Sequence, residues 1–102
     1  MIHPFLQDKL SVINKIFEES SIKKAYVFGS IVNGDFNEKS DIDFIVSFKD
    51  DTDPIKQGEL WWSLSEKLSK QLNRNVDILI EKPIRNKYLA QEIEKYKEVI
   101  YG

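Results

Sequence analysis

The chain has 102 residues, 41% of them apolar and 12% aromatic, which suits one compact domain with one core and leaves no room for a second. Its formal charge of −2 is spread along the chain, which argues against a basic surface for a polyanion such as double-stranded nucleic acid. Without cysteine and with one histidine, the chain excludes disulfides, thiolate zinc sites and the usual cysteine or serine–histidine nucleophiles, so hard oxygen ligands remain.

Neither a membrane segment nor a secretion signal is visible in the sequence. No apolar run approaches the roughly 20 residues of a membrane-spanning helix. The start MIHPFLQDKL lacks the basic-then-apolar order of a signal peptide, and no repeat or low-complexity tract follows it. We therefore expect a cytoplasmic protein without membrane contact, folded as a single domain over residues 1–102.

The first half of the chain predicts one helix and two strands. Apolar residues at helical spacing predict a helix from Pro4 to about Ser20, with the proline at its start. The run KKAYVFGS, residues 23–30, predicts a strand that ends at Gly29, followed by a short turn or helix. In DIDFIVSF, residues 41–48, every second side chain is apolar, which predicts a second strand.

The second half predicts a long helix, a third strand and a last helix. An acidic loop separates the second strand from a helix that runs to Asn73. The run NVDILI, residues 75–80, predicts the third strand, and Pro83 introduces a helix that includes Ile100. The last five residues also fit an extended segment, so both alternatives stay open there.

Two adjacent tryptophans fall within the long helix. Trp61 fits the apolar sector of that helix, whereas Trp62 is rotated by about 100° from it. We therefore expect Trp62 either to cover an edge of the sheet or to anchor a partner.

The order of these elements, α-β-α-β-α-β-α, predicts an α+β domain of α/β character, with a small mixed three-stranded sheet packed with helices. Because a helical crossover joins the second and third strands, these two should be parallel. The connection between the first and second strands is short, which favours an antiparallel pair. This topology brings Gly29, Asp43 and Asp77 to the same edge of the sheet.

Three aspartates at that edge point to a metal site. Asp41 and Asp43 are two residues apart on an extended chain, so they face the same way with backbones about 6.6–7 Å apart. Asp77 adds a third carboxylate from the neighbouring strand. Such a group repels itself unless a cation with a preference for oxygen ligands, Mg²⁺ or Mn²⁺, is bound. A lone Asp-x-Asp pair is more often a turn cap beside a solvated side chain, but a third acid inside an apolar strand favours the metal site.

The pair Gly29-Ser30 supplies a second half of the site. Glycine lets the backbone approach a ligand closely, and a helix that begins at Ser30 would offer N–H groups and a hydroxyl to phosphate oxygens. Taken alone the pair is an ordinary turn, but beside three carboxylates it predicts a nucleotide site.

These residues together resemble a known signature. Gly29-Ser30, ten intervening residues, Asp41-x-Asp43 and a later Asp77 are similar to the motif of the DNA polymerase β-type nucleotidyltransferase superfamily, in particular its minimal nucleotidyltransferase (MNT) group. The resemblance implies a polymerase β palm-like fold. It also implies that Gly29 and Ser30 bind the triphosphate, that Asp41 and Asp43 bind metal, and that Asp77 binds metal or takes a proton from the attacking hydroxyl.

The resemblance extends to substrate and partner, with one departure. It implies two Mg²⁺ ions, an NTP substrate, and transfer of an NMP, above all AMP from ATP, to a hydroxyl acceptor. It also implies an antitoxin role beside a small helical HEPN-type toxin. The family pattern commonly has a basic residue, usually arginine, where this chain has Asn33, which still offers a neutral donor to the nucleotide.

Two other functions remain open at this point. An inactive homologue could keep the fold and neutralise its partner by contact alone, and Asn33 is the residue that favours this alternative. A small-molecule nucleotidyltransferase of the aminoglycoside type is a weaker alternative, because no acceptor domain follows. The predicted nucleotide-binding core takes up nearly all residues of the chain. We therefore expect recognition of the acceptor to depend on a second protein, on a second copy of the chain or on features of the acceptor itself.

Overall fold

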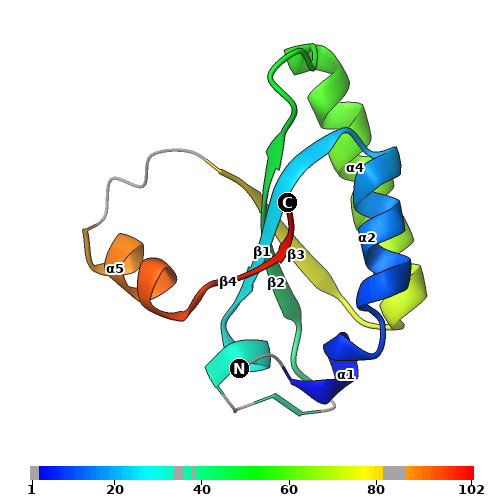
Figure 1. Cartoon of the computed structure of the whole chain (residues 1–102). Helices are drawn as coiled ribbons and strands as arrows, with labels where there is room; N and C mark the ends of the chain where they lie inside the picture. Colours follow the sequence, from blue (N-terminus) through cyan, green and yellow to red (C-terminus); the bar gives the residue numbers. More distant parts are fainter. Residues whose placement is uncertain (1–2, 34–35, 38, 82–86) are drawn as a thin grey trace.

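A computed structural model describes residues 3–33, 36–37, 39–81 and 87–102 of the chain (Figure 1). From α2 onward helices and strands alternate along it, as the sequence predicts for an α+β domain. The elements are α1 (Pro4–Gln7), α2 (Leu10–Glu19), β1 (Ile22–Phe28), α3 (Ser30–Asn33), β2 (Ile42–Phe48), α4 (Pro54–Leu72), β3 (Val76–Ile80), α5 (Lys87–Tyr96) and β4 (Glu98–Tyr101).

The strands form one mixed sheet in the order β3-β2-β1-β4. β2 and β3 are parallel, while β1 is antiparallel to both β2 and β4, so the predicted directions of the first three strands are confirmed. The sheet has a fourth strand where the sequence predicted three. Ile100 belongs to this strand and not to the last helix, because the chain after Tyr96 pairs with β1, with Val99 opposite Tyr26.

One face of the sheet carries the main core. Val27, Phe44 and Ile78 lie side by side on β1, β2 and β3, and each is buried. α2 and α4 cover this face (Figure 1), and their buried residues include Phe17 and Leu64. The apolar sides of the helices and of the strands thus form one core layer. This layer fixes the register of β2, because a shift by one residue would turn Asp43 into the core.

The first predicted helix is divided into two. A turn at Asp8 and Lys9 separates α1 from α2, and the Lys9 amide donates to the carbonyl of Leu6 across it, at 2.9 Å. The turn lets α1 lie near α3, where the His3 amide donates to the Ile31 carbonyl at 2.9 Å. The apolar spacing continues through both segments, which is why it predicts a single helix.

The opposite face of the sheet carries Asp43 and Ile45 on β2 beside Asp77 and Leu79 on β3. α5 lies on this side, set apart from α2 and α4 (Figure 1). The predicted helix start at Pro83 lies outside the described residues. In the part of the chain that is described, no helix has both the length and the apolar character that crossing a membrane requires.

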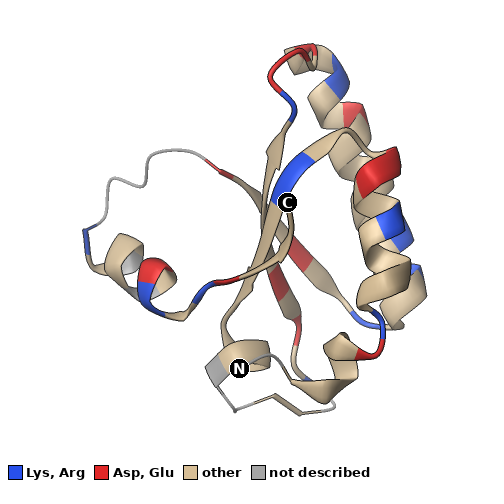
Figure 2. Cartoon of the chain, viewed as in Figure 1, with Lys and Arg blue, Asp and Glu red and all other residues tan. Residues whose placement is uncertain are grey.

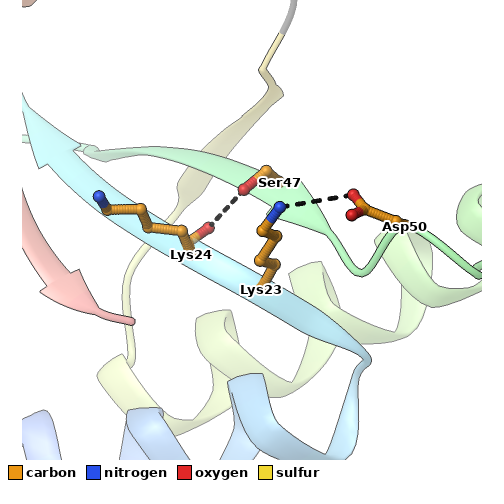
Figure 3. A network of polar contacts seen from close by, with 4 residues as sticks. All are labelled: Lys23, Lys24, Ser47 and Asp50. Carbon is orange, nitrogen blue, oxygen red and sulfur yellow. Dashed lines mark hydrogen bonds and ion pairs between the residues drawn. The ribbon is translucent and has the colours of Figure 1, made fainter.

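The acidic loop after β2 is a solvated turn. Asp53 caps α4 by accepting a hydrogen bond from the Ile55 amide at 2.8 Å. Asp50 forms an exposed ion pair of 3.5 Å with Lys23 on β1, beside the Ser47 hydroxyl that donates to the Lys24 carbonyl (Figure 3). Exposed ion pairs of this kind contribute little to stability. The main structural role of the loop is therefore the Asp53 cap that begins α4.

Candidate active site

Two aspartates from different strands stand next to each other at the start of β2 and β3. The parallel register places Asp43 directly beside Asp77, and the antiparallel register places Asp43 beside Phe28, the last residue of β1. Figure 2 shows the acidic segments of β2 and β3 side by side. The predicted convergence of Asp43, Asp77 and the end of β1 at one edge is therefore confirmed.

Gly29 makes the close approach of Asp43 to the end of β1 possible. Its φ of +79° belongs to the left-handed region that favours glycine. A Cβ at this position would lie 2.6 Å from Oδ2 of Asp43, which is closer than real Cβ contacts allow. Ser30 follows as the first residue of α3, which the Val32 amide helps to close by donating to the Gly29 carbonyl at 3.0 Å. The glycine of the predicted Gly-Ser pair is thus required by the carboxylate beside it.

The electrostatics single out Asp43 among the three acids. Its side chain is half-buried, and this burial is the main cause that raises the pKa of its carboxyl, followed by the charges of Asp77 and Asp41. The side chains of Asp41 and Asp77 are exposed. The charges of Asp77 and Asp41 are therefore close enough to disfavour the ionised form of Asp43, which burial also disfavours.

A hard divalent cation suits this donor set chemically, because the donors are all carboxylate oxygens. Such a cation would also offset the burial and the neighbouring negative charges that disfavour the ionised form of Asp43. Among the described residues, however, no three acidic or histidine side chains are gathered closely enough to form a metal site as they stand. Asp41 precedes the first paired residue of β2, Ile42, and is exposed, so sheet pairing does not hold it as it holds Asp43. To be bound by all three acids, a cation would require the exposed side chains of Asp41 and Asp77 to turn toward Asp43.

Asn33 is the last residue of α3, and its side chain lies outside what the structure describes. Arg74 borders the site without being singled out by any sequence pattern. Together with Asp41 it lines a polar hollow of about 410 Å³ between the loop before β2 and the turn after α4. A single arginine after a helix end carries no signal in the sequence, because its partners are distant along the chain.

Comparison with known families decides the identity of this fold. The family described as "Polymerase beta, Nucleotidyltransferase" matches residues 11–102, which include β1, α3, β2 and β3. The chain belongs to this nucleotidyltransferase family. The resemblance seen in the sequence motif is therefore confirmed.

A curated relative of this nucleotidyltransferase comes from Methanocaldococcus jannaschii and bears the name "Putative protein adenylyltransferase MJ0128". The two are 34% identical over 97 residues, which cover 94% of this chain and 93% of the relative. The similarity thus spans the site as well as the core.

Solved structures show the same fold. A chain in the crystal structure of a toxin–antitoxin complex with AMP-PNP superposes with a TM-score of 0.69 at 26% identity, over 91% of this chain and 73% of that one. A chain in the complex of a tri-AMPylated HEPN toxin with its MNT antitoxin from Shewanella oneidensis gives a TM-score of 0.63 at 24% identity, over 94% and 71%. At that identity the second likeness concerns the fold alone.

Proposed function

We propose that this nucleotidyltransferase is a metal-dependent adenylyltransferase that moves AMP from ATP to a hydroxyl group of a protein. The observation that carries the proposal is the placement of Asp43, paired in register with Asp77 and packed against Gly29. The 34% identity to a relative named as a protein adenylyltransferase supports the choice of AMP and of a protein acceptor.

Each predicted site residue has a role in this proposal. Asp41, Asp43 and Asp77 would hold Mg²⁺, as two ions, with Mn²⁺ as a substitute. When bound, the metal supplies charge neutralisation at the phosphates and a more acidic acceptor hydroxyl. Gly29 and Ser30 would face the triphosphate, with Asn33 as a neutral donor.

The chain's own groups account for the rest of the reaction. The acceptor oxygen forms a bond to the α-phosphorus, the bond from that phosphorus to the β-phosphate oxygen breaks, and pyrophosphate leaves. Asp77 is exposed at the start of β3, so an acceptor can reach its carboxylate, which would accept the hydroxyl proton as the alternative to holding metal. Asp43 is held by strand pairing on both sides and orients the reacting groups.

The proposed acceptor and partner is a small helical HEPN-type toxin, which the transfer of AMP would silence. Two similar folds come from toxin–antitoxin complexes, one solved with AMP-PNP and one with an AMPylated HEPN toxin. In this proposal the chain is the antitoxin of such a pair.

A second function is supported by a separate observation. The described carboxylates are not gathered as a metal site, and Asn33 stands where the family pattern commonly has a basic residue. These features fit an antitoxin that neutralises its partner by binding, without transferring a nucleotide.

Transfer from labelled ATP separates the two functions. We expect that ATP labelled at its α-phosphate, together with Mg²⁺, labels the proposed partner, for which the product of the neighbouring gene is the first candidate to test. Asp43→Asn should lower the labelling rate by at least ~100-fold. The substitution removes a carboxylate that would hold the metal, and the metal would stabilise the transition state more than the bound substrate. The matched control is Asp51→Asn in the exposed loop after β2.

Labelling that is unchanged in Asp43→Asn would contradict the proposed chemistry. If a variant with Asp41, Asp43 and Asp77 all replaced by Asn still neutralises the partner, binding alone accounts for the antitoxin role. Because burial and the charges of Asp77 and Asp41 disfavour the ionised form of Asp43, the triple replacement is expected to remain folded.

A further inference from the structure

Arg74 lies in the turn between α4 and β3, three residues before Asp77, and its backbone is well fixed. α4 ends at Leu72, and Asn73 adopts the left-handed conformation, with φ of 52°, that commonly closes a helix. The Ser69 hydroxyl donates to the Arg74 carbonyl at 2.7 Å, and the Arg74 amide donates to the Ser69 carbonyl at 3.3 Å. The guanidinium therefore extends from a rigid base.

The guanidinium binds the backbone of the loop that leads to Asp41. Its Nη1 donates to the carbonyl of Asn37 at 2.8 Å and to the carbonyl of Ser40 at 3.1 Å. The second of these belongs to the residue directly before Asp41. A charged donor makes shorter and stronger hydrogen bonds than a neutral one, so these two contacts hold the loop firmly.

Two aromatic rings confine the same group. The guanidinium carbon lies 4.7 Å from the ring centre of Phe5 on α1 and 4.4 Å from that of Phe36 in the loop. The two rings are themselves 5.6 Å apart between centroids. A planar guanidinium can stack on aromatic faces and donate in its plane at once, which the compact ammonium of lysine cannot do.

Asn37 and Ser40, whose carbonyls Arg74 binds, also contact each other. The Ser40 amide donates to the Asn37 carbonyl at 3.0 Å, and the Asn37 amide donates to the Ser40 hydroxyl at 3.0 Å. Two residues later the Ile42 amide donates to the Asn75 carbonyl at 3.2 Å and begins the pairing of β2 with β3. Arg74 thus joins the segment before Asp41 to the segment before Asp77.

We propose that Arg74 is a positioning residue of the active site, whose guanidinium sets the position of Asp41 relative to Asp43 and Asp77 by clamping the loop backbone. The inference rests on the proposed function, because it assigns to Arg74 the alignment of the carboxylates that would hold the metal with ATP. It also explains how the backbone that leads into Asp41, which strand pairing does not hold, keeps a defined position.

Binding of Mn²⁺ with ATP to the isolated chain, measured by calorimetry, tests the clamp without requiring the acceptor. Arg74→Ala should weaken the affinity by ~10-fold, the size of effect typical of groups that orient metal ligands. Arg74→Lys keeps a charged donor for the carbonyls without the stacked plane, so it should recover part of the affinity. Lys67→Ala, an exposed residue of α4, should bind as the wild type does.

A purely structural effect is separated by two further measurements. Ile16→Val, a core truncation in α2, reports how a small loss of stability alone affects binding, and all titrations are run well below each variant's Tm. Amide exchange should become faster in Arg74→Ala at Ser40, whose amide lies in the clamped loop, and should stay slow at Phe44 within β2.

The outcomes are distinct. Weakened binding in Arg74→Ala, with partial recovery in Arg74→Lys and no change in Lys67→Ala, supports the clamp. Wild-type affinity in Arg74→Ala, or the same loss in Ile16→Val at equal stability, overturns the clamp and leaves the proposed function standing. A wild-type chain that binds no Mn²⁺ with ATP overturns the proposed function itself.

Discussion

At the scale of single residues, the site depends on one contact between a backbone and a carboxylate. Gly29 has no side chain, and Oδ2 of Asp43 occupies part of the space that a Cβ would fill. The positive φ of Gly29 adds a second reason for glycine, because other residues pay a conformational cost there. Both the backbone conformation and the position of the Asp43 carboxylate therefore require glycine at residue 29.

Gly29→Ala should damage both stability and the site. The new methyl group would have to displace the Asp43 carboxylate, and the positive φ would be strained, so we expect a loss of ~1–3 kcal/mol in the free energy of unfolding. Urea denaturation measures the loss, and calorimetry with Mn²⁺ and ATP should show weaker binding.

Gly58→Ala is the matched control for that substitution. Gly58 lies within α4, and nothing lies within 4 Å of a Cβ built at its position. Alanine should therefore stabilise the helix by ~0.5–1 kcal/mol and leave binding unchanged. Equal effects of the two substitutions would show that Gly29 has no special relation to Asp43.

At the scale of elements, α4 holds the edge strand of the sheet. The indole N–H of Trp61 donates to the Ile78 carbonyl of β3 at 2.9 Å, which satisfies a backbone group on a strand that pairs, among the described strands, with β2 alone. The sequence placed Trp61 in the apolar sector of the helix, and left Trp62 to cover the edge or contact a partner. The indole that reaches the edge is that of Trp61, while the side chain of Trp62 is 62% exposed. Partner contact by Trp62 stays a prediction.

Trp61→Phe should destabilise the protein by ~1 kcal/mol in chemical denaturation, because it removes this hydrogen bond and leaves a carbonyl of β3 without it. Trp62→Phe, one residue along the same helix, should change the free energy of unfolding by less than ~0.5 kcal/mol, as is usual for exposed positions. A larger effect at Trp62 than at Trp61 would contradict this assignment of the edge contact.

Helical and strand periodicity predicts most of these elements, because it reports which side chains face the core. It does not reveal the break between α1 and α2, since the apolar spacing runs through the turn at Asp8 and Lys9. It also leaves β4 undecided, because four residues are too few to distinguish the two periods and the pairing of Val99 with Tyr26 is a distant contact.

At the scale of the whole molecule, topology rather than local pattern assembles the site. The helical crossover through α4 is what makes β2 and β3 parallel and brings Asp43 beside Asp77, so this pair could be predicted from the sequence. The clamp by Arg74 could not, because the two backbone carbonyls that it binds lie 34 and 37 residues away and the other described contacts of its guanidinium are the ring faces of Phe5 and Phe36.

The pH dependence of the free energy of unfolding should reveal the effect of bringing Asp41, Asp43 and Asp77 near one another. Burial, Asp77 and Asp41 raise the pKa of Asp43 above its ordinary value of 3.8. Between that value and the raised one, the folded state binds more protons than the unfolded state, so the free energy of unfolding falls as pH rises through this window. A neutral side chain of the same shape removes the penalty.

Asp43→Asn should therefore raise the Tm by a few degrees at pH 7 in the presence of EDTA, and the difference from wild type should vanish below pH 3.8, where the carboxyl is protonated in both states. Added Mg²⁺ with ATP should raise the Tm of the wild type and not that of the variant, because binding to the folded state stabilises it. Thermal unfolding across the pH range measures both effects. An Asp43→Asn variant less stable than wild type at pH 7 would mean that the carboxylate supports the fold, and the case for a cluster of acids that needs a cation would fail with it.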